Sequence, residues 1–207
     1  MRFTSKIVLL VTMVLPLCAA WAATPQAPEP AAPASPRPEG SLVVLTNGIT
    51  RLNVLSNKAP MMVFVARRPW NTAHDDSIAN FYIKGMYGDE PSWLMVPFTL
   101  RGSANYSFET KEGADCTLTD MRLLRTKSGQ LQVIVAAREF GETYVDEMPV
   151  QFDFYRLVSH QHGETPAGPD VSFEFVGTSM SRDKYCDVNV AFNLELNLGG
   201  TGISAAK

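Results

Sequence analysis

The stretch from Leu118 to Ala137, LTDMRLLRTKSGQLQVIVAA, holds two apolar runs on either side of a short polar segment. The second run, 131–137, is almost continuously apolar, as in a strand that is covered on both faces. The intervening TKSGQ places Ser128 and Gly129 at the tip of a turn, where glycine favours a tight hairpin. The stretch therefore predicts two neighbouring antiparallel strands.

Strand patterns also dominate the rest of the chain. Apolar and polar residues alternate in 94–101, 150–155 and 171–175, and a period of two buries one face of a strand. The run 61–66 is more continuously apolar. We expect a mainly β fold of about eight strands, with antiparallel sheets arranged as a sandwich or as one strongly curved sheet.

One helix is expected near the C-terminus. Asp187 is a suitable N-cap, and two glycines, Gly199 and Gly200, are expected to end the helix. Between them, apolar residues follow at helical spacing: Val188, Ala191, Phe192 and Leu196.

The N-terminal residues predict export. Arg2 and Lys6 precede an apolar run that is too short to span a bilayer, and small residues follow at cleavage spacing. We expect a signal peptide over 1–23 and periplasmic localisation. The next segment, 24–39, is rich in proline and alanine and predicts a linker. One β-rich domain then covers 40–198, followed by a flexible tail over 199–207.

The charge balance argues against nucleic acid as a partner. The chain has 18 basic and 21 acidic residues, a net charge of −3, and without Arg2 and Lys6 the exported chain is at −5. No later basic stretch forms a cluster. No second apolar run approaches membrane length, so no membrane span is expected.

Two cysteines, Cys116 and Cys186, remain once Cys18 leaves with the signal peptide. An even pair in an exported protein predicts a disulfide, with two free buried thiols as the alternative. The bond would close a loop of roughly 70 residues and contribute about 4 kcal/mol.

Three short patterns resemble the motifs of serine β-lactam enzymes: Ser181 to Lys184 as S-x-x-K, Ser103 to Asn105 as S-x-N, and Lys127 to Gly129 as a variant of K-T-G. Their order along the chain is wrong for those enzymes, and the helices that would carry the serine are missing. We therefore predict no catalytic residue, and a turn, a loop and a hairpin tip at these places.

Metal binding is a weaker option. His160 and His162 would point the same way on a strand and suit zinc, but the third ligand would be Glu164 or the distant His74. Solvated loop histidines are the plainer interpretation. The acidic run 138–149 fits no calcium-loop spacing, so it predicts a charged connection between strands. We expect no cofactor.

The stretch VARRPWNTAHDDSIANFYI, from Val65 to Ile83, is the best candidate for a binding surface. Arginine binds carboxylates through a planar fork, and adjacent residues of a strand face opposite ways. One of the two arginines would pair with an internal acid, and the other would face the ligand. The alternative is structural, with both arginines paired internally and the loop merely closing two strands. The candidate binding residues are Arg67, Arg68, Trp70, Asn71 and His74, and the candidate internal acids are Glu139, Glu142, Asp146 and Glu147.

The same stretch resembles the carbapenem intrinsic-resistance proteins of the CarG type, in the Ala-Arg-Arg, Asn, Ala-His and Phe-Tyr-Ile positions of 66–83. GADC at 113–116 with RLLR at 122–125, the block 133–155, and YCDVN with AF at 185–192 also resemble that family, in order over about 150 residues. The chain departs from the family pattern at 53–64, where NVLSNKAPMMVF lacks the family's carboxylate-rich turn, which puts a cation role there in doubt.

The resemblance implies an exported protein that protects its host against carbapenems without hydrolysing them. A carbapenem or a cell-wall-derived small molecule would be the ligand, and a protein partner or a homodimer is left open. Two alternatives are a general envelope interaction module that binds cell-wall fragments or a protein, and a metal- or serine-dependent hydrolase.

Overall fold

The computed structural model describes residues 38, 40–55, 57–69, 75–100, 103–113, 115–160, 170–200 and 202–203. Every described residue belongs to one compact unit of the chain, within Ala34–Lys207. The predicted signal peptide and, apart from Pro38, the predicted linker lie outside the described residues.

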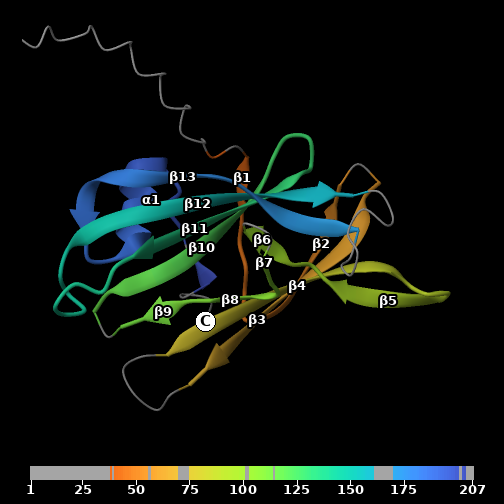
Figure 1. Ribbon diagram of the computed structural model, residues 1–207, viewed down its shortest axis with the longest axis horizontal. Helices are drawn as coiled ribbons and strands as arrows, with labels where there is room; N and C mark the ends of the chain where they lie inside the picture. Colours follow the sequence, from red (N-terminus) through yellow and green to blue (C-terminus); the bar gives the residue numbers. More distant parts are fainter. Residues whose placement is uncertain are drawn as a thin grey trace, which may run out of the picture. The chain divides into compact units, whose positions relative to one another are not determined.

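Thirteen strands form two sheets in the described part of the chain (Figure 1). All strand pairs are antiparallel except β13 with β6. The eight-stranded sheet consists of β1 (Ser41–Val43), β10 (Thr117–Arg125), β11 (Leu131–Arg138), β12 (Met148–Ser159), β13 (Val171–Tyr185), β6 (Phe98–Leu100) and β7 (Ser103–Asn105) in this order, and β9 (Lys111–Glu112) pairs with β10. The five-stranded sheet consists of β2 (Gly48–Val54), β3 (Ala59–Arg68), β4 (Asp76–Tyr87) and β5 (Glu90–Met95), and β8 (Ser107–Glu109) pairs with β4.

The predicted hairpin is confirmed. Strands β10 and β11 pair from Thr119 opposite Ala137 to Arg125 opposite Leu131. The turn is closed by the Gly129 amide, which donates to the Thr126 carbonyl at 2.9 Å, and Gly129 has a φ of 82°. Only glycine adopts this angle without strain.

Two apolar cores explain why 118–137 is so apolar. One core lies between the sheets and includes Leu123 of β10 with Phe81 of β4. The other lies between the eight-stranded sheet and the helix, and includes Leu124 of β10 with Phe192. Because neighbouring strand residues face opposite ways, β10 contributes to both cores. The predicted mainly β fold with one C-terminal helix is confirmed.

The helix α1 (Val188–Leu196) covers the outer face of the eight-stranded sheet (Figure 1). Asp187 caps it as predicted, accepting a bond from the Asn189 amide at 2.7 Å. The predicted stop is wrong, because Asn197 ends the helix in a left-handed conformation with φ 54°. Asparagine adopts this conformation more readily than other non-glycine residues.

The described part of the predicted flexible tail packs against the sheet. Ile203 is buried in the core between the sheets, and its amide donates to Asp120 at 3.1 Å. A side chain at Gly202 would overlap Asp120 and Arg122, so the chain approaches β10 here in a way that only glycine allows.

Candidate functional site

The predicted surface begins where β3 ends and β4 starts. Strand β3 stops before Pro69, which has no amide to continue the ladder. Arg67 lies opposite Ser77, and Arg68 lies opposite Asp76. Among the other predicted site residues, Trp70, Asn71 and His74 lie outside the described residues.

Arg68 is held by two acids. Its Nη2 donates to Asp76 at 2.9 Å and to Glu109 at 3.0 Å, and its Nη1 donates to Glu109 at 3.3 Å. The hydrogen bonds to Asp76 and Glu109 raise the pKa of the guanidinium above its ordinary value. These contacts join β3, β4 and β8, so Arg68 braces the edge of the five-stranded sheet.

Arg67 is placed differently. It shares a strand face with buried Ser77, on the side of the five-stranded sheet that packs against the other sheet. Its single described ion pair is with Glu112 of β9, at 3.6 Å, which is longer than a hydrogen bond. About a third of its side chain, 35%, remains exposed.

Glu112 has other partners that hold it. The hydroxyls of Thr110 and Ser77 donate to its Oε1 at 2.8 and 3.1 Å. Burial raises the pKa of this carboxyl, because the opposing effects of these hydroxyls and of Arg67 are smaller. Glu112 therefore does not depend on Arg67 for its position.

The predicted ion-pair partners of the arginines are wrong. Arg67 pairs with Glu112 of β9, which lies 45 residues further along the chain. Arg68 pairs with Asp76 of β4, eight residues away, and with Glu109 of β8, 41 residues away. The acids predicted instead lie in the connection between β11 and β12: Glu139, Glu142, Asp146 and Glu147.

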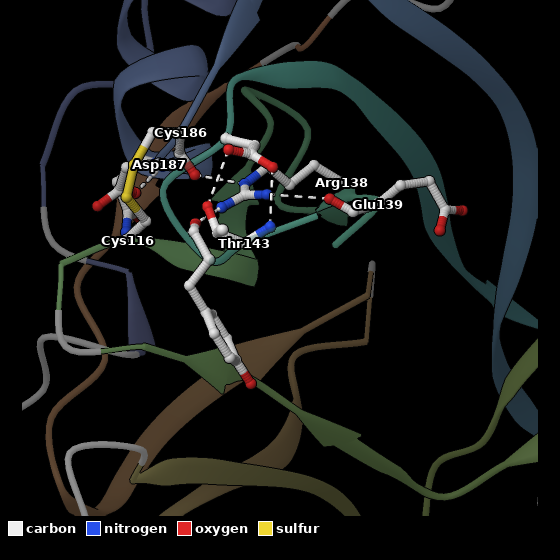
Figure 2. The surroundings of a disulfide bond; sticks show 9 residues. Cys116, Arg138, Glu139, Thr143, Cys186 and Asp187 are labelled. Atoms are coloured by element: carbon white, nitrogen blue, oxygen red, sulfur yellow. Dashed lines mark hydrogen bonds between the residues drawn. A yellow bond between two sulfur atoms is a disulfide. The ribbon is translucent and has the colours of Figure 1, made fainter. Parts of the chain in front are cut away.

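That connection is organised by a different arginine, Arg138, beside the disulfide (Figure 2). Its guanidinium donates to the carbonyls of Cys186, Glu139 and Tyr144. Burial lowers the pKa of Arg138, against the opposing charges of Asp146 and Asp187. Cys116 and Cys186 form the predicted disulfide, with their Cα atoms 5.6 Å apart, and tie the start of β10 to the N-cap of α1.

A second arginine is completely buried with its acid. Arg122 pairs with Asp120 at 3.3 Å, and both side chains are 0% exposed. Burial lowers the pKa of Arg122, which Asp120 partly offsets. This pair was not predicted from the sequence. Two charged residues within the otherwise mostly apolar run 118–124 indicate it, because charged side chains are rarely buried unless they are paired.

The predicted turn and loop positions of the serine patterns differ from the structure. Ser181 and Lys184 lie on β13, and the Ser181 hydroxyl accepts from the Val150 amide at 2.8 Å and donates to the Asp183 carbonyl at 2.6 Å. The S-x-N pattern forms β7, while Lys127 to Gly129 is the hairpin tip, as predicted. Ser181 is therefore tied to backbone on a strand.

His160 contacts two groups through one ring nitrogen. Its Nε2 lies 2.8 Å from the Ser172 hydroxyl and 3.4 Å from Glu174, whereas a serine, histidine and acid relay uses both ring nitrogens. His162 and Glu164 lie outside the described residues. Within the described ranges, no group of three or more potential ligands is placed to hold a metal ion, and no helix could cross a membrane.

An open groove with a volume of about 350 Å³ lies elsewhere on the described part of the chain. It is lined by α1 and the segment that follows it, at Asn189, Val190, Asn193, Leu194, Gly199 and Gly200. Of the described site residues, neither Arg67 nor Arg68 lines it. The described residues of its walls are uncharged, whereas the arginine edge offers guanidinium groups that can bind an anion.

These features define a class: a two-sheet β domain with one covering helix, in which arginines brace the strand ends. The family model of carbapenem resistance protein CarG-like matches residues 45–194, and the chain belongs to this family. The crystal structure of CarG is similar, with a TM-score of 0.62 and 20% sequence identity, over 74% of this chain and 94% of that one. This likeness supports the fold. No curated protein matches the chain.

Proposed function

We propose that this protein is exported to the periplasm and protects the cell against carbapenems by binding, without hydrolysing them. The observation that carries the proposal is the membership in the CarG-like family over 45–194. The basic and apolar N-terminus supports export. The engagement of Ser181 with backbone and of one His160 nitrogen with two neighbours supports a role other than hydrolysis.

Within this proposal, Arg67 is the arginine that meets the ligand. A carbapenem carries a carboxylate, which a guanidinium recognises with two parallel hydrogen bonds. Arg68 already donates both terminal nitrogens to Asp76 and Glu109. Arg67 has only a long ion pair to an acid that Thr110 and Ser77 hold in place. Exchanging that ion pair for a ligand therefore disturbs the fold least.

Alanine variants of the two arginines test this assignment. Arg67→Ala should lose protection of cells on carbapenem plates with almost no change in melting temperature, because a long ion pair of 3.6 Å, whose guanidinium is about one-third exposed, contributes about 1 kcal/mol or less. Arg68→Ala should lower the melting temperature, and Arg51→Ala, at an exposed arginine of β2, should change neither. If every loss of protection follows a loss of folded protein, the arginine edge is structural.

Direct assays separate binding from hydrolysis. A carbapenem should raise the melting temperature of the purified wild-type protein and should do so less for Arg67→Ala. Incubation with a carbapenem and a chromogenic cephalosporin, with and without zinc, should show no turnover above background. Turnover that disappears in Ser181→Ala or His160→Ala would contradict the proposal and favour a hydrolase.

A further inference from the structure

The connection between β11 and β12 exposes apolar side chains. Phe140, Tyr144 and Val145 are 45%, 37% and 53% exposed. The two rings contact each other edge to face, with their centroids 4.7 Å apart. Antiparallel strands need only two to five residues to turn, whereas this connection runs from 139 to 147. Closing the hairpin alone does not explain it.

The loop 139–147 is also ordered from within. Asp146 accepts from the amides of Glu142 and Thr143 at 2.7 and 2.8 Å and from the Thr143 hydroxyl at 2.8 Å. The hydrogen bonds from Thr143, and then from Glu142, lower the pKa of Asp146. Gly141 has a φ of 65°, and any side chain there would press on Asp146. Arg138 also donates to the Glu139 and Tyr144 carbonyls of the loop (Figure 2), so several hydrogen bonds fix the backbone that carries the exposed side chains.

The charge of the loop is one-sided. It contains four acids and no basic residue. Asp146 is used inside the loop, while Glu139, Glu142 and Glu147 are exposed around the apolar side chains. Complementary charge guides association and rejects like-charged partners. An anionic membrane surface would therefore be repelled, and a basic partner would be attracted.

We propose that the loop 139–147 is a preformed docking site for a basic polypeptide segment that carries an apolar side chain. The apolar side chain packs on Phe140 and Val145, and lysine or arginine side chains pair with Glu142 and Glu147. Rigid aromatic side chains lose little conformational entropy on binding, and fixing a loop in advance lowers the cost of association. This site is separate from the arginine edge, so the two proposals stand or fail independently.

Selection from a random dodecapeptide library displayed on phage tests the proposal. The target is the immobilised, oxidised protein, and the enriched peptides are then synthesised and their affinities measured. We expect enrichment of peptides that combine lysine or arginine with a large apolar residue. Affinity should fall at least tenfold in Phe140→Ser/Val145→Ser and in Glu142→Gln/Glu147→Gln, and rise as salt is lowered.

Matched controls lie elsewhere on the surface. Val176→Ser and Glu90→Gln alter an exposed apolar residue of β13 and an exposed acid of β5 and should leave affinity unchanged. Asp146→Ala removes the internal acceptor without altering the proposed contacts, so it should weaken binding severalfold. Each variant must melt as a folded, disulfide-bonded protein. No enrichment, or enriched peptides that bind the loop variants as well as wild type, would overturn the proposal.

Discussion

Replacing Arg122 with methionine should be among the most damaging single changes in the protein. The guanidinium makes five hydrogen bonds, to Asp120, Asn189 and the carbonyls of Met121, Leu198 and Gly200. It also lies 4.4 Å from the centre of the Phe192 ring. These contacts join β10 to the first turn and the middle of α1 and to the segment beyond the helix. Methionine fills much of the space but leaves the Asp120 carboxylate buried without its cation.

The expected loss follows from that uncompensated charge. Removing one partner of a buried ion pair costs about 3–5 kcal/mol, which is a large share of a typical unfolding free energy of about 5–15 kcal/mol. With a urea slope of about 2 kcal/mol per molar, the unfolding midpoint should fall by about 2 M. The matched control is Arg125→Met on the same strand, whose guanidinium makes an exposed bond to the Asn53 carbonyl and should cost about 1 kcal/mol.

The assay is equilibrium urea unfolding of the oxidised protein, followed by circular dichroism. The double variant Asp120→Asn/Arg122→Met should be more stable than Arg122→Met alone, because asparagine can still accept from the amides of Met121 and Ile203 without a buried charge. Equal losses in Arg122→Met and Arg125→Met would refute the reasoning. A double variant that is no better than Arg122→Met would show that the buried acid is not the source of the loss.

Three further predictions concern single groups. Burial raises the pKa of Glu112, so the stability that Glu112 contributes is fully present below its pKa in the unfolded chain and is lost as the pH rises through its pKa in the folded protein. Glu112→Gln should therefore match or exceed the wild-type melting temperature at neutral pH, and the difference should vanish in acid. The hydrogen bond from the Tyr185 hydroxyl to Glu195 raises the pKa of Tyr185 to about 12. The stability that this bond contributes is therefore fully present below about pH 10 and is lost as the pH rises through about 12. The last phenolate to appear in an ultraviolet titration should be absent in Tyr185→Phe. Gly202→Ala should displace the segment that buries Ile203 and cost about 2 kcal/mol in urea unfolding, and an unchanged midpoint would show that this packing contributes little.

Local patterns predicted several strands, the β10–β11 hairpin and the helix, but the expected strand over 94–101 is divided between β5 and β6, which lie in different sheets. Alternation over 150–155 and the turn at Ser128 and Gly129 define strands and a hairpin, since both depend only on neighbours in the chain. The parallel pairing of β13 with β6 joins segments more than seventy residues apart, and the short strands β8 and β9 carry too few residues to show a period. Separations of 41 and 45 residues likewise hid Glu109 and Glu112 as the partners of Arg68 and Arg67. The helix stop at Asn197 was missed because two nearby glycines are the stronger local pattern.

The positions that resemble the family mostly hold the fold together. In RLLR, Arg122 anchors the helix, Leu123 and Leu124 enter the two cores, and Arg125 reaches the end of β2.

The last block behaves in the same way. Tyr185 and Arg182 hold Glu195, Cys186 is in the disulfide, and Asp187 caps α1. Burial alone would raise the pKa of Glu195, but the bonds from Arg182 and Tyr185 outweigh it and lower the pKa. The carboxylate therefore stays ionised and keeps both partners over a wide pH range.

A match to such positions explains why family membership and fold agree, because both depend on residues that hold the strands and the helix together. Residues on which stability depends little are better candidates for a functional role. Arg67 makes only a long ion pair, to Glu112, which the hydroxyls of Thr110 and Ser77 also hold. The loop 139–147 exposes Phe140 and Val145 on a backbone that its own hydrogen bonds fix. Variants of Arg67 and of the loop 139–147 should change function without unfolding the protein. Variants of residues that hold the fold together, such as Arg122, should lower stability and function together.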